Sequence, residues 1–324
     1  MRRMFAAAMA AAAVLAAAPV VAQQAWPAKP LKLIVPYAPG GSTDQLSRAI
    51  AERLGVALGQ AVVVDNRPGG NTIIGAEATA KSPPDGYTMF MGSSGSLAVN
   101  PQVYAKLPYD PNRDFAYVTL TAASPLVLVV NPSVPARNLK EFVDLAKAKP
   151  GGVTFASVGN GNPLHLAGEL FKSMAGVDML HVPYNGSAPA LTALLGGQVD
   201  SMFDVVLTAT PHVKAGKLRA LGITGPRRVS ALPDVPTIAE SGYPGYDASI
   251  WFGIVVPKGT PQPVVQRLNA ELVKILRSDE MKQKFDPQAL ELTASTPEEM
   301  TAFVAKESQK WGKVIRDFNI RIDQ

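Results

Sequence analysis

The chain has 324 residues, 47% of them hydrophobic and 18% charged, which describes a globular protein of about two domains rather than a disordered chain. The formal net charge is +5, or +3 once Arg2 and Arg3 are set aside, and no basic cluster or RNA-binding motif is present. We therefore expect no nucleic-acid partner. The absence of cysteine excludes disulfides, thiolate metal sites and lipid attachment at a cysteine.

Residues 1–22 have the pattern of a secretory signal peptide. Arg2 and Arg3 form a short basic region, residues 4–18 are apolar and alanine-rich, and a small-residue cleavage site ends at Ala22. The apolar run is short for a membrane span of about 20 residues. We expect cleavage near Ala22 and export of the mature chain to the periplasm. Residues 2–5 weakly resemble a twin-arginine signal, so the export route stays open, with the ordinary secretory route favoured.

Strands and helices alternate along the first part of the mature chain. Apolar runs at residues 31–37, 61–65 and 87–91 predict strands. Helices are predicted after the first and second runs, the first with apolar residues at helical spacing and either Ser42 or Gly41 at its start. Three strand–loop–helix units in succession favour a parallel sheet with right-handed crossovers.

A second alternating set follows two strand-like runs at residues 115–120 and 126–130, which we interpret as the first crossing between two lobes. A helix is predicted at 139–148, and strands at 153–157, 179–183, 199–203 and 218–224. The strand at 249–256 is expected to carry the chain back to the first lobe. Predicted helix starts use four caps: Asn162 before Pro163, Ser187, Thr260 with Pro261, and Thr296 with Pro297 and Glu299.

This order predicts an α/β protein of two lobes, each a mainly parallel sheet flanked by helices. We expect the first lobe to comprise residues 23–122 and 248–324, and the second to comprise residues 123–247. Each lobe would then contribute turns at the carboxyl ends of its strands, where open α/β sheets bind ligands. These turns are residues 37–44, 67–71 and 92–96 in the first lobe, and 157–163, 184–188 and Asp204 in the second. They contain hydroxyls, helix-start N–H groups and a single arginine, Arg67, which favours an anionic ligand recognised by neutral donors.

Catalytic readings of the same residues are weaker. The segment around Ser94 departs from the nucleophile-elbow pattern, and the three histidines (His165, His181 and His212) are not at metal-ligand spacing. Residues 159–164 begin like a dinucleotide fingerprint but lack its third glycine. We therefore expect no enzyme, no metal and no cofactor, although a secreted serine hydrolase using Ser94 remains an alternative.

The ordered motifs of the mature chain resemble one family, the Bug-type extracytoplasmic solute receptors of tripartite tricarboxylate transporters. They are Tyr37-Ala-Pro-Gly-Gly-Ser-Thr-Asp44, Asn66-Arg-Pro-Gly-Gly70, Asn100-Pro101, Leu107-Pro-Tyr-Asp110, Val182-Pro-Tyr-Asn-Gly186, Met202-Phe-Asp204, Ala215-Gly-Lys-Leu-Arg-Ala220, Leu232-Pro-Asp-Val-Pro-Thr237 and Trp251-Phe-Gly253. The resemblance implies a two-lobed, Venus-flytrap receptor of type II that closes on a small carboxylate. The ligand would be an amino acid, a di- or tricarboxylate or an aromatic acid, delivered by a monomeric receptor to a membrane permease. A ligand-sensing subunit of a membrane signalling system is the alternative role.

The resemblance also implies the residues that contact the ligand. They are Tyr37, Gly41, Ser42, Thr43, Ser93, Ser94, Ser157, Gly159, Asn160, Tyr184, Asn185, Gly186, Ala188 and Asp204. Asp44 is expected to be a helix-start residue rather than a contact. Three positions depart from the family pattern: Asn185 where many relatives carry Lys or Arg, Leu97 in place of a frequent His, and Val205 where Asn is common. These departures leave the identity of the carboxylate open.

Overall fold

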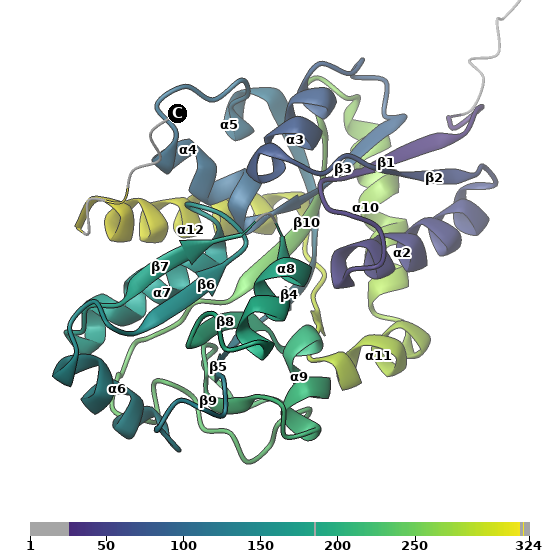
Figure 1. The fold of residues 1–324 in the computed structure, drawn as a ribbon. Coiled ribbons are helices and arrows are strands. Elements are labelled where there is room, and N and C mark those ends of the chain that lie inside the picture. The colour runs from purple at the N-terminus through teal and green to yellow at the C-terminus, as the bar shows by residue number, and fades with distance from the viewer. Residues whose placement is uncertain (1–25, 185, 318–319, 321–324) are drawn as a thin grey trace, which may run out of the picture.

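The computed structural model describes residues 26–184, 186–317 and 320. The predicted signal peptide and Asn185 therefore lie outside the described residues. Two sheets, each flanked by helices, make up the molecule (Figure 1), and we call each sheet with its helices a lobe. The predicted α/β class and two-sheet architecture are confirmed.

The first lobe has a six-stranded sheet in the order β11-β4-β10-β3-β1-β2. Its elements are β1 (Leu31–Val35), α2 (Ser42–Leu58), β2 (Val62–Asn66), η1 (Gly70–Thr72), α3 (Ile73–Ala80), β3 (Thr88–Ser93), η2 (Gly95–Val99), α4 (Asn100–Val103), α5 (Pro111–Asp114), β4 (Phe115–Ser124), β10 (Ile250–Pro257), α10 (Gln262–Leu276), α11 (Asp279–Phe285), η3 (Asp286–Gln288), β11 (Glu291–Leu292) and α12 (Pro297–Asp317). Strand β1 pairs in parallel with β2 and β3, whereas β10 is antiparallel to both β3 and β4.

The second lobe has a five-stranded sheet in the order β7-β6-β8-β5-β9. Its elements are β5 (Leu126–Val130), α6 (Leu139–Ala148), β6 (Thr154–Ser157), α7 (Pro163–Ala175), β7 (Leu180–Pro183), α8 (Ser187–Leu195), β8 (Ser201–Val205), α9 (Val206–Lys214) and β9 (Arg219–Ile223). Strand β6 is parallel to β7 and β8, and β5 alone runs against its neighbours. Both sheets are mixed: most strands of each sheet point in one direction, as predicted, but β10 and β11 in the first sheet and β5 in the second run the other way and pair antiparallel with their neighbours.

Several helix starts differ from the predicted caps. Asn162 and Thr296 cap as expected: the Asn162 side chain accepts from Leu164 N, and Thr296 exchanges two hydrogen bonds with Glu299. The predictions for Ser187 and Thr260 are wrong, because backbone geometry rather than a side-chain oxygen starts those helices, and of the two starts predicted for the first helix the structure has Gly41. Gly41, Gly186 and Pro261 are the N-caps of α2, α8 and α10, none with a side-chain cap bond, and Thr260 donates to Pro257 O instead. The two glycine starts leave their helix N–H groups without a competing side chain.

Two chain segments connect the lobes. Strand β4 runs directly through Pro125 into β5, and the chain returns from the second lobe into β10, as the sequence predicted. Thr224 links these segments, since its hydroxyl accepts from Leu126 N (2.7 Å) and donates to Ala248 O (3.0 Å). Gly225 lies so close that a Cβ there would stand 2.9 Å from Pro125 Cβ. We call this bridged pair of crossings the hinge.

Candidate functional site

In the second lobe, three predicted turns follow neighbouring strands. The register pairs Ser157 with Pro183 and Ala156 with Met202, so the carboxyl ends of β7, β6 and β8 meet at one edge of the sheet. Tyr184 N donates to Ser157 O at 2.9 Å. The structure therefore brings the predicted residues Ser157, Tyr184 and Asp204 to one rim.

In the first lobe, the rim is formed by the ends of β1 and β3. Tyr37 is half-buried and meets the ring of Phe252 edge-on, with 6.3 Å between centroids. Burial raises the pKa of Tyr37 to about 12, and a hydrogen bond with Ser93 opposes this shift. The predicted residues Tyr37 and Ser93 are thus in contact, and Tyr37 stays a neutral donor at physiological pH.

Asp44 organises the loop that precedes α2. Its buried carboxylate accepts from Gly40 N, Arg48 Nε and Asn66 Nδ2, each at 2.9 Å, and Asn66 also donates to Tyr37 O at 3.0 Å. Burial alone would raise the pKa of Asp44, but these hydrogen bonds hold it below its ordinary value. Asp44 lies in the first turn of α2, as predicted, and its partners fix residues 37–40. Sequence reasoning missed both partners: Arg48 is at the i,i+4 spacing that could have indicated the pair, whereas Asn66 lies 22 residues from Asp44 and gives no such signal.

The turn after β3 contains a buried hydroxyl without a partner. Ser93 N donates to Ser96 Oγ at 2.9 Å, so those two residues satisfy one another. Ser94 is only 1% exposed, yet its Oγ has no hydrogen-bond partner among the described residues. A buried polar group in this state is uncommon and calls for an explanation such as a ligand. The same observation argues against Ser94 as a nucleophile, because neither a histidine nor a carboxylate contacts it.

A second network behind this turn was not predicted. Asn100 donates to Asn71 O (2.8 Å) and lies near Tyr109 Oη (3.3 Å), which donates to Ser96 O (2.8 Å). Asn71 and Thr72 have φ values of 51° and 75°, in the left-handed region that L-residues rarely adopt. The network holds this strained backbone against η2, and the family motifs at residues 100–101 and 107–110 supply two of its members.

Two histidines support the turn after β6. His181 Nε2 lies 2.6 Å from Ser157 Oγ, and His165 Nδ1 accepts from Gly161 N at 3.0 Å. Their rings stack with centroids 3.8 Å apart. Burial, followed by the neighbouring His165, lowers the pKa of His181 to about 3. A histidine with this pKa is a poor general base at neutral pH, so the Ser157–His181 pair positions the turn rather than activating the serine.

This pair predicts acid sensitivity. Because the pKa of His181 is lower in the folded chain than its ordinary value of 6.5, its contribution to stability is complete above pH 6.5 and is lost as the pH falls toward 3. The other ionisable groups around it are His165, Glu169 and Lys172. For His181→Gln we expect the fall in unfolding free energy between pH 7 and 4, measured by urea denaturation, to be shallower than in the parent chain. An unchanged slope would contradict this assignment.

Asp204 is a buried carboxylate at the second rim. It is 0% exposed, and it accepts from Val205 N and Thr208 Oγ1, both at 2.8 Å. Burial raises its pKa to about 6, which these two hydrogen bonds only partly offset. As the pH falls through about 6, the Asp204 carboxylate gains a proton, so it changes from a hydrogen-bond acceptor to a carboxylic acid that can also donate.

The two rims approach each other across the molecule. A Cβ on Gly95, in the turn after β3, would stand 3.7 Å from Pro163 Cδ at the start of α7. Exposure differs among the predicted residues. Gly41, Asn160 and Ala188 are exposed, Tyr37, Gly159, Tyr184 and Gly186 are half-buried, and Thr43, Ser93, Ser94, Ser157 and Asp204 are buried. The Ser42 backbone begins α2, and Asn185 lies outside the described residues.

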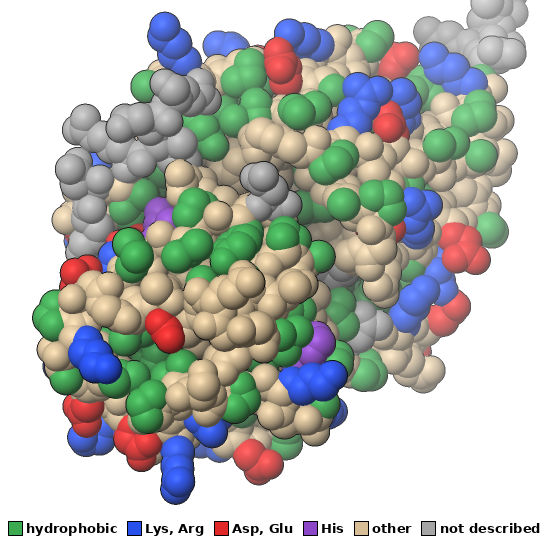
Figure 2. Space-filling model, in the orientation of Figure 1, with side chains coloured by type: hydrophobic (Ala, Val, Ile, Leu, Met, Phe, Trp, Pro, Cys, Tyr) green, Lys and Arg blue, Asp and Glu red, His purple; other side chains and the backbone are tan. Residues whose placement is uncertain are grey.

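Basic side chains take little part in these rims. Arg67 is bound to Asp65, with Nε and Oδ2 2.9 Å apart. Figure 2 shows Lys and Arg mostly toward the periphery of the viewed face, with apolar and uncharged surface at its centre. Among the described residues, no cluster of three or more His, Asp or Glu side chains could hold a metal, and no helix could span a membrane by length and hydropathy.

Comparison with known proteins identifies the family. Residues 46–320 match the model of the tripartite tricarboxylate transporter family receptor, TctC. The protein BugT of Bordetella pertussis is 40% identical over 307 residues, covering 94% of each chain. Among solved structures, R. palustris Rpa4515 with adipate has 38% identity and a TM-score of 0.86, covering 91% of this chain and 99% of its own. MatC from Rhodopseudomonas palustris with bound malate has 31% identity and a TM-score of 0.82, covering 90% and 100%.

The family match spans most of the chain, and the two similar structures match it over nearly their whole length. These relatives are solute-binding receptors and not enzymes. The chain therefore belongs to the receptor family of tripartite tricarboxylate transporters.

Proposed function

We propose that this receptor binds a small carboxylate between its lobes and delivers it to the membrane permease of a tripartite transporter. The observation that carries the proposal is the pairing of two polar strand-end rims, one with the unpartnered Ser94 hydroxyl, in which no predicted contact is basic. Neutral N–H and hydroxyl donors at helix starts suit a carboxylate. The adipate and malate bound by two similar proteins support the same ligand class.

Magnitudes indicate that the lobes close on the ligand. One helix N-terminus contributes about 0.3–1 kcal/mol to an anion, and about 2 kcal/mol when partly buried. Micromolar affinity requires about 8 kcal/mol. Direct hydrogen bonds from both rims, with water excluded, supply the difference when the lobes approach.

The same proposal includes a monomeric receptor in the periplasm, exported by residues 1–22 with cleavage near Ala22. We propose the lobes as residues 23–122 with 248–324, and residues 123–247; β4 continues to Ser124, two residues past the first boundary. The contacts are the fourteen residues that the family pattern implies. The sequence has Asn185 where many relatives carry Lys or Arg, and the lack of a cation at this position favours recognition by neutral groups.

A thermal-shift screen with amino acids, dicarboxylates and aromatic acids tests the ligand class. A bound carboxylate at 100 times its dissociation constant adds about 2.7 kcal/mol to the unfolding free energy. An absence of stabilisation by every acid in the panel would contradict the proposal.

Ser94 gives this screen an internal control. Since Ser94 Oγ has no partner, we expect Ser94→Ala to leave the unliganded stability unchanged or slightly higher while the carboxylate-induced shift decreases. Ser96→Ala is the matched variant, because Ser96 Oγ accepts from Ser93 N and its loss lowers the unliganded stability by about 1–3 kcal/mol. If Ser94→Ala bound carboxylates as the parent chain does, Ser94 would not be a contact.

A further inference from the structure

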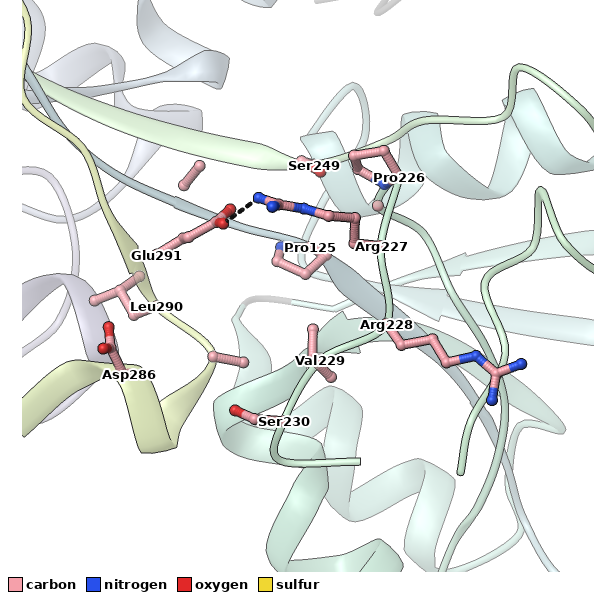
Figure 3. Close-up of a pocket in the computed structure, with 13 residues that line it drawn as sticks. Pro125, Pro226, Arg227, Arg228, Val229, Ser230, Ser249, Asp286, Leu290 and Glu291 are labelled. Atoms are coloured by element: carbon pink, nitrogen blue, oxygen red, sulfur yellow. Dashed lines mark hydrogen bonds and ion pairs between the residues drawn. The ribbon is translucent and has the colours of Figure 1, made fainter. Parts of the chain in front are cut away.

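A cavity of about 440 Å³ lies at the hinge, away from both rims. Figure 3 shows it between β11 and η3 of the first lobe on one side and the loop after β9 of the second lobe on the other. Its walls come from both lobes and both crossings: Ala123, Pro125, Gly225, Pro226, Arg227, Arg228, Val229, Ser230, Ser249, Asp286, Ala289, Leu290 and Glu291. A space with walls in both lobes changes in size when the lobes rotate.

The strand order places this cavity across the hinge from the rims. In the first sheet, hinge strands β4 and β10 separate β11 from β3, β1 and β2, which carry the first rim. In the second sheet, β5 separates β9 from β8, β6 and β7, which carry the second rim. Elements on opposite sides of a hinge axis move in opposite senses. Approach of the rims therefore widens the cavity, and separation of the rims narrows it.

An ion pair crosses the cavity between the lobes. Arg227 Nη2 lies 2.6 Å from a carboxylate oxygen of Glu291, on β11 (Figure 3). Both side chains are mostly exposed, at 78% and 62%, so the pair adds little stability by itself. The pair joins the wall of the cavity in the second lobe to the wall in the first lobe, so the distance between these two side chains changes when the walls separate. Arg228 points away from Arg227 in Figure 3 and pairs with Glu240.

We propose that this hinge cavity sets the balance between open and closed lobes, so that side-chain volume placed in it favours closure and tightens carboxylate binding. The cavity narrows when the lobes open, so a larger side chain in the cavity obstructs opening. The closed form has room for the same volume. The proposal rests on the lobe closure of the proposed function, but lobe separation can be measured without any ligand.

Two variants place volume in the cavity. Val229 and Ser230 both line the cavity (Figure 3). Val229→Phe and Ser230→Trp each add side-chain volume there, and we call these two variants the wedges. Asp234→Trp is the matched control, since Asp234 is exposed on the same connection and does not line the cavity. Because the sequence has no cysteine, Glu52→Cys on α2 and Thr192→Cys on α8 allow one spin-label pair to report the distance between the lobes.

Without added ligand, both wedges are expected to shift the spin-label distances toward the shorter population, and Asp234→Trp is expected to match the parent chain. Titration with adipate is expected to show about two- to tenfold tighter binding for the wedges, as the closure-competent fraction rises. Unchanged or longer distances in a wedge variant that unfolds cooperatively would overturn the proposal. If no carboxylate bound the parent chain, the proposed function would fail while the distances still decided the role of the cavity.

Discussion

Asp44→Ala is expected to lower the unfolding free energy by about 2–4 kcal/mol and to weaken carboxylate binding by at least about tenfold. The substitution leaves Gly40 N and Asn66 Nδ2 without their buried acceptor, and it separates Arg48 from its carboxylate. Residues 37–40 then lose the contacts that hold them in front of α2. Urea denaturation with and without adipate measures both effects.

Two variants distinguish the effect of losing the hydrogen bonds of Asp44 from the effect of losing a negative charge. Asp44→Asn keeps the size of the side chain and one acceptor, so it should fall between the parent chain and Asp44→Ala. Asp65→Ala removes a more exposed carboxylate on the adjacent β2, which pairs with Arg67, and should cost about 1 kcal/mol or less. If Asp44→Ala lost stability but kept full affinity, the loop would not depend on this carboxylate.

Asp204→Asn is expected to stabilise the unliganded chain by on the order of 2–3 kcal/mol at pH 7.5. The pKa of Asp204 is raised to about 6 from 3.8, so its contribution to stability is complete below pH 3.8 and is lost as the pH rises through 6. Asparagine removes the buried charge and can still accept from Val205 N. The Thr208 hydroxyl is within 2.9 Å of Val205 O and can turn toward it. The difference in unfolding free energy between variant and parent should therefore grow from pH 4 to 7.5.

The same titration should affect binding. A charged Asp204 repels an anion at the rim, so adipate affinity in the parent chain is expected to rise as the pH falls through about 6. In Asp204→Asn this dependence should disappear. Asp200→Asn, at the opposite end of β8, controls for general effects, because Asp200 binds Thr154 far from the rim. A stability difference that did not vary with pH would show that Asp204 does not titrate in this range.

Much of the fold could be predicted because its signals are local. The helix predicted at 139–148 matches α6, and the return of the chain through β10 follows from one apolar run. Some boundaries were less accurate: β8 is Ser201–Val205, two residues after the prediction, and β4 continues to Ser124, four residues past its predicted end. Helix α11 and strand β11 were not predicted, and these short elements depend on packing rather than on periodicity.

The rims could be predicted because parallel strands bring their carboxyl ends to one edge. The residues that hold the rims in place through hydrogen bonds could not be predicted. Asn66 reaches Asp44 over 22 residues, and His181 reaches Ser157 over 24, through contacts that only the register creates. The hinge cavity joins residues 123 to 291, and its walls carry no shared motif. Sequence pattern thus indicates where a ligand could bind, while the groups that shape that place depend on the tertiary structure.

The position of β10 has a consequence for the order in which the two lobes can fold. All eight of its residues are buried, and it lies between β3 and β4, which belong to a much earlier part of the chain. The earlier strands therefore have an unfilled gap at the centre of their sheet until the chain as far as residue 257 is available to fold. The second lobe is continuous in sequence and meets no such delay. The half of the molecule that emerges first is thus the last to be completed.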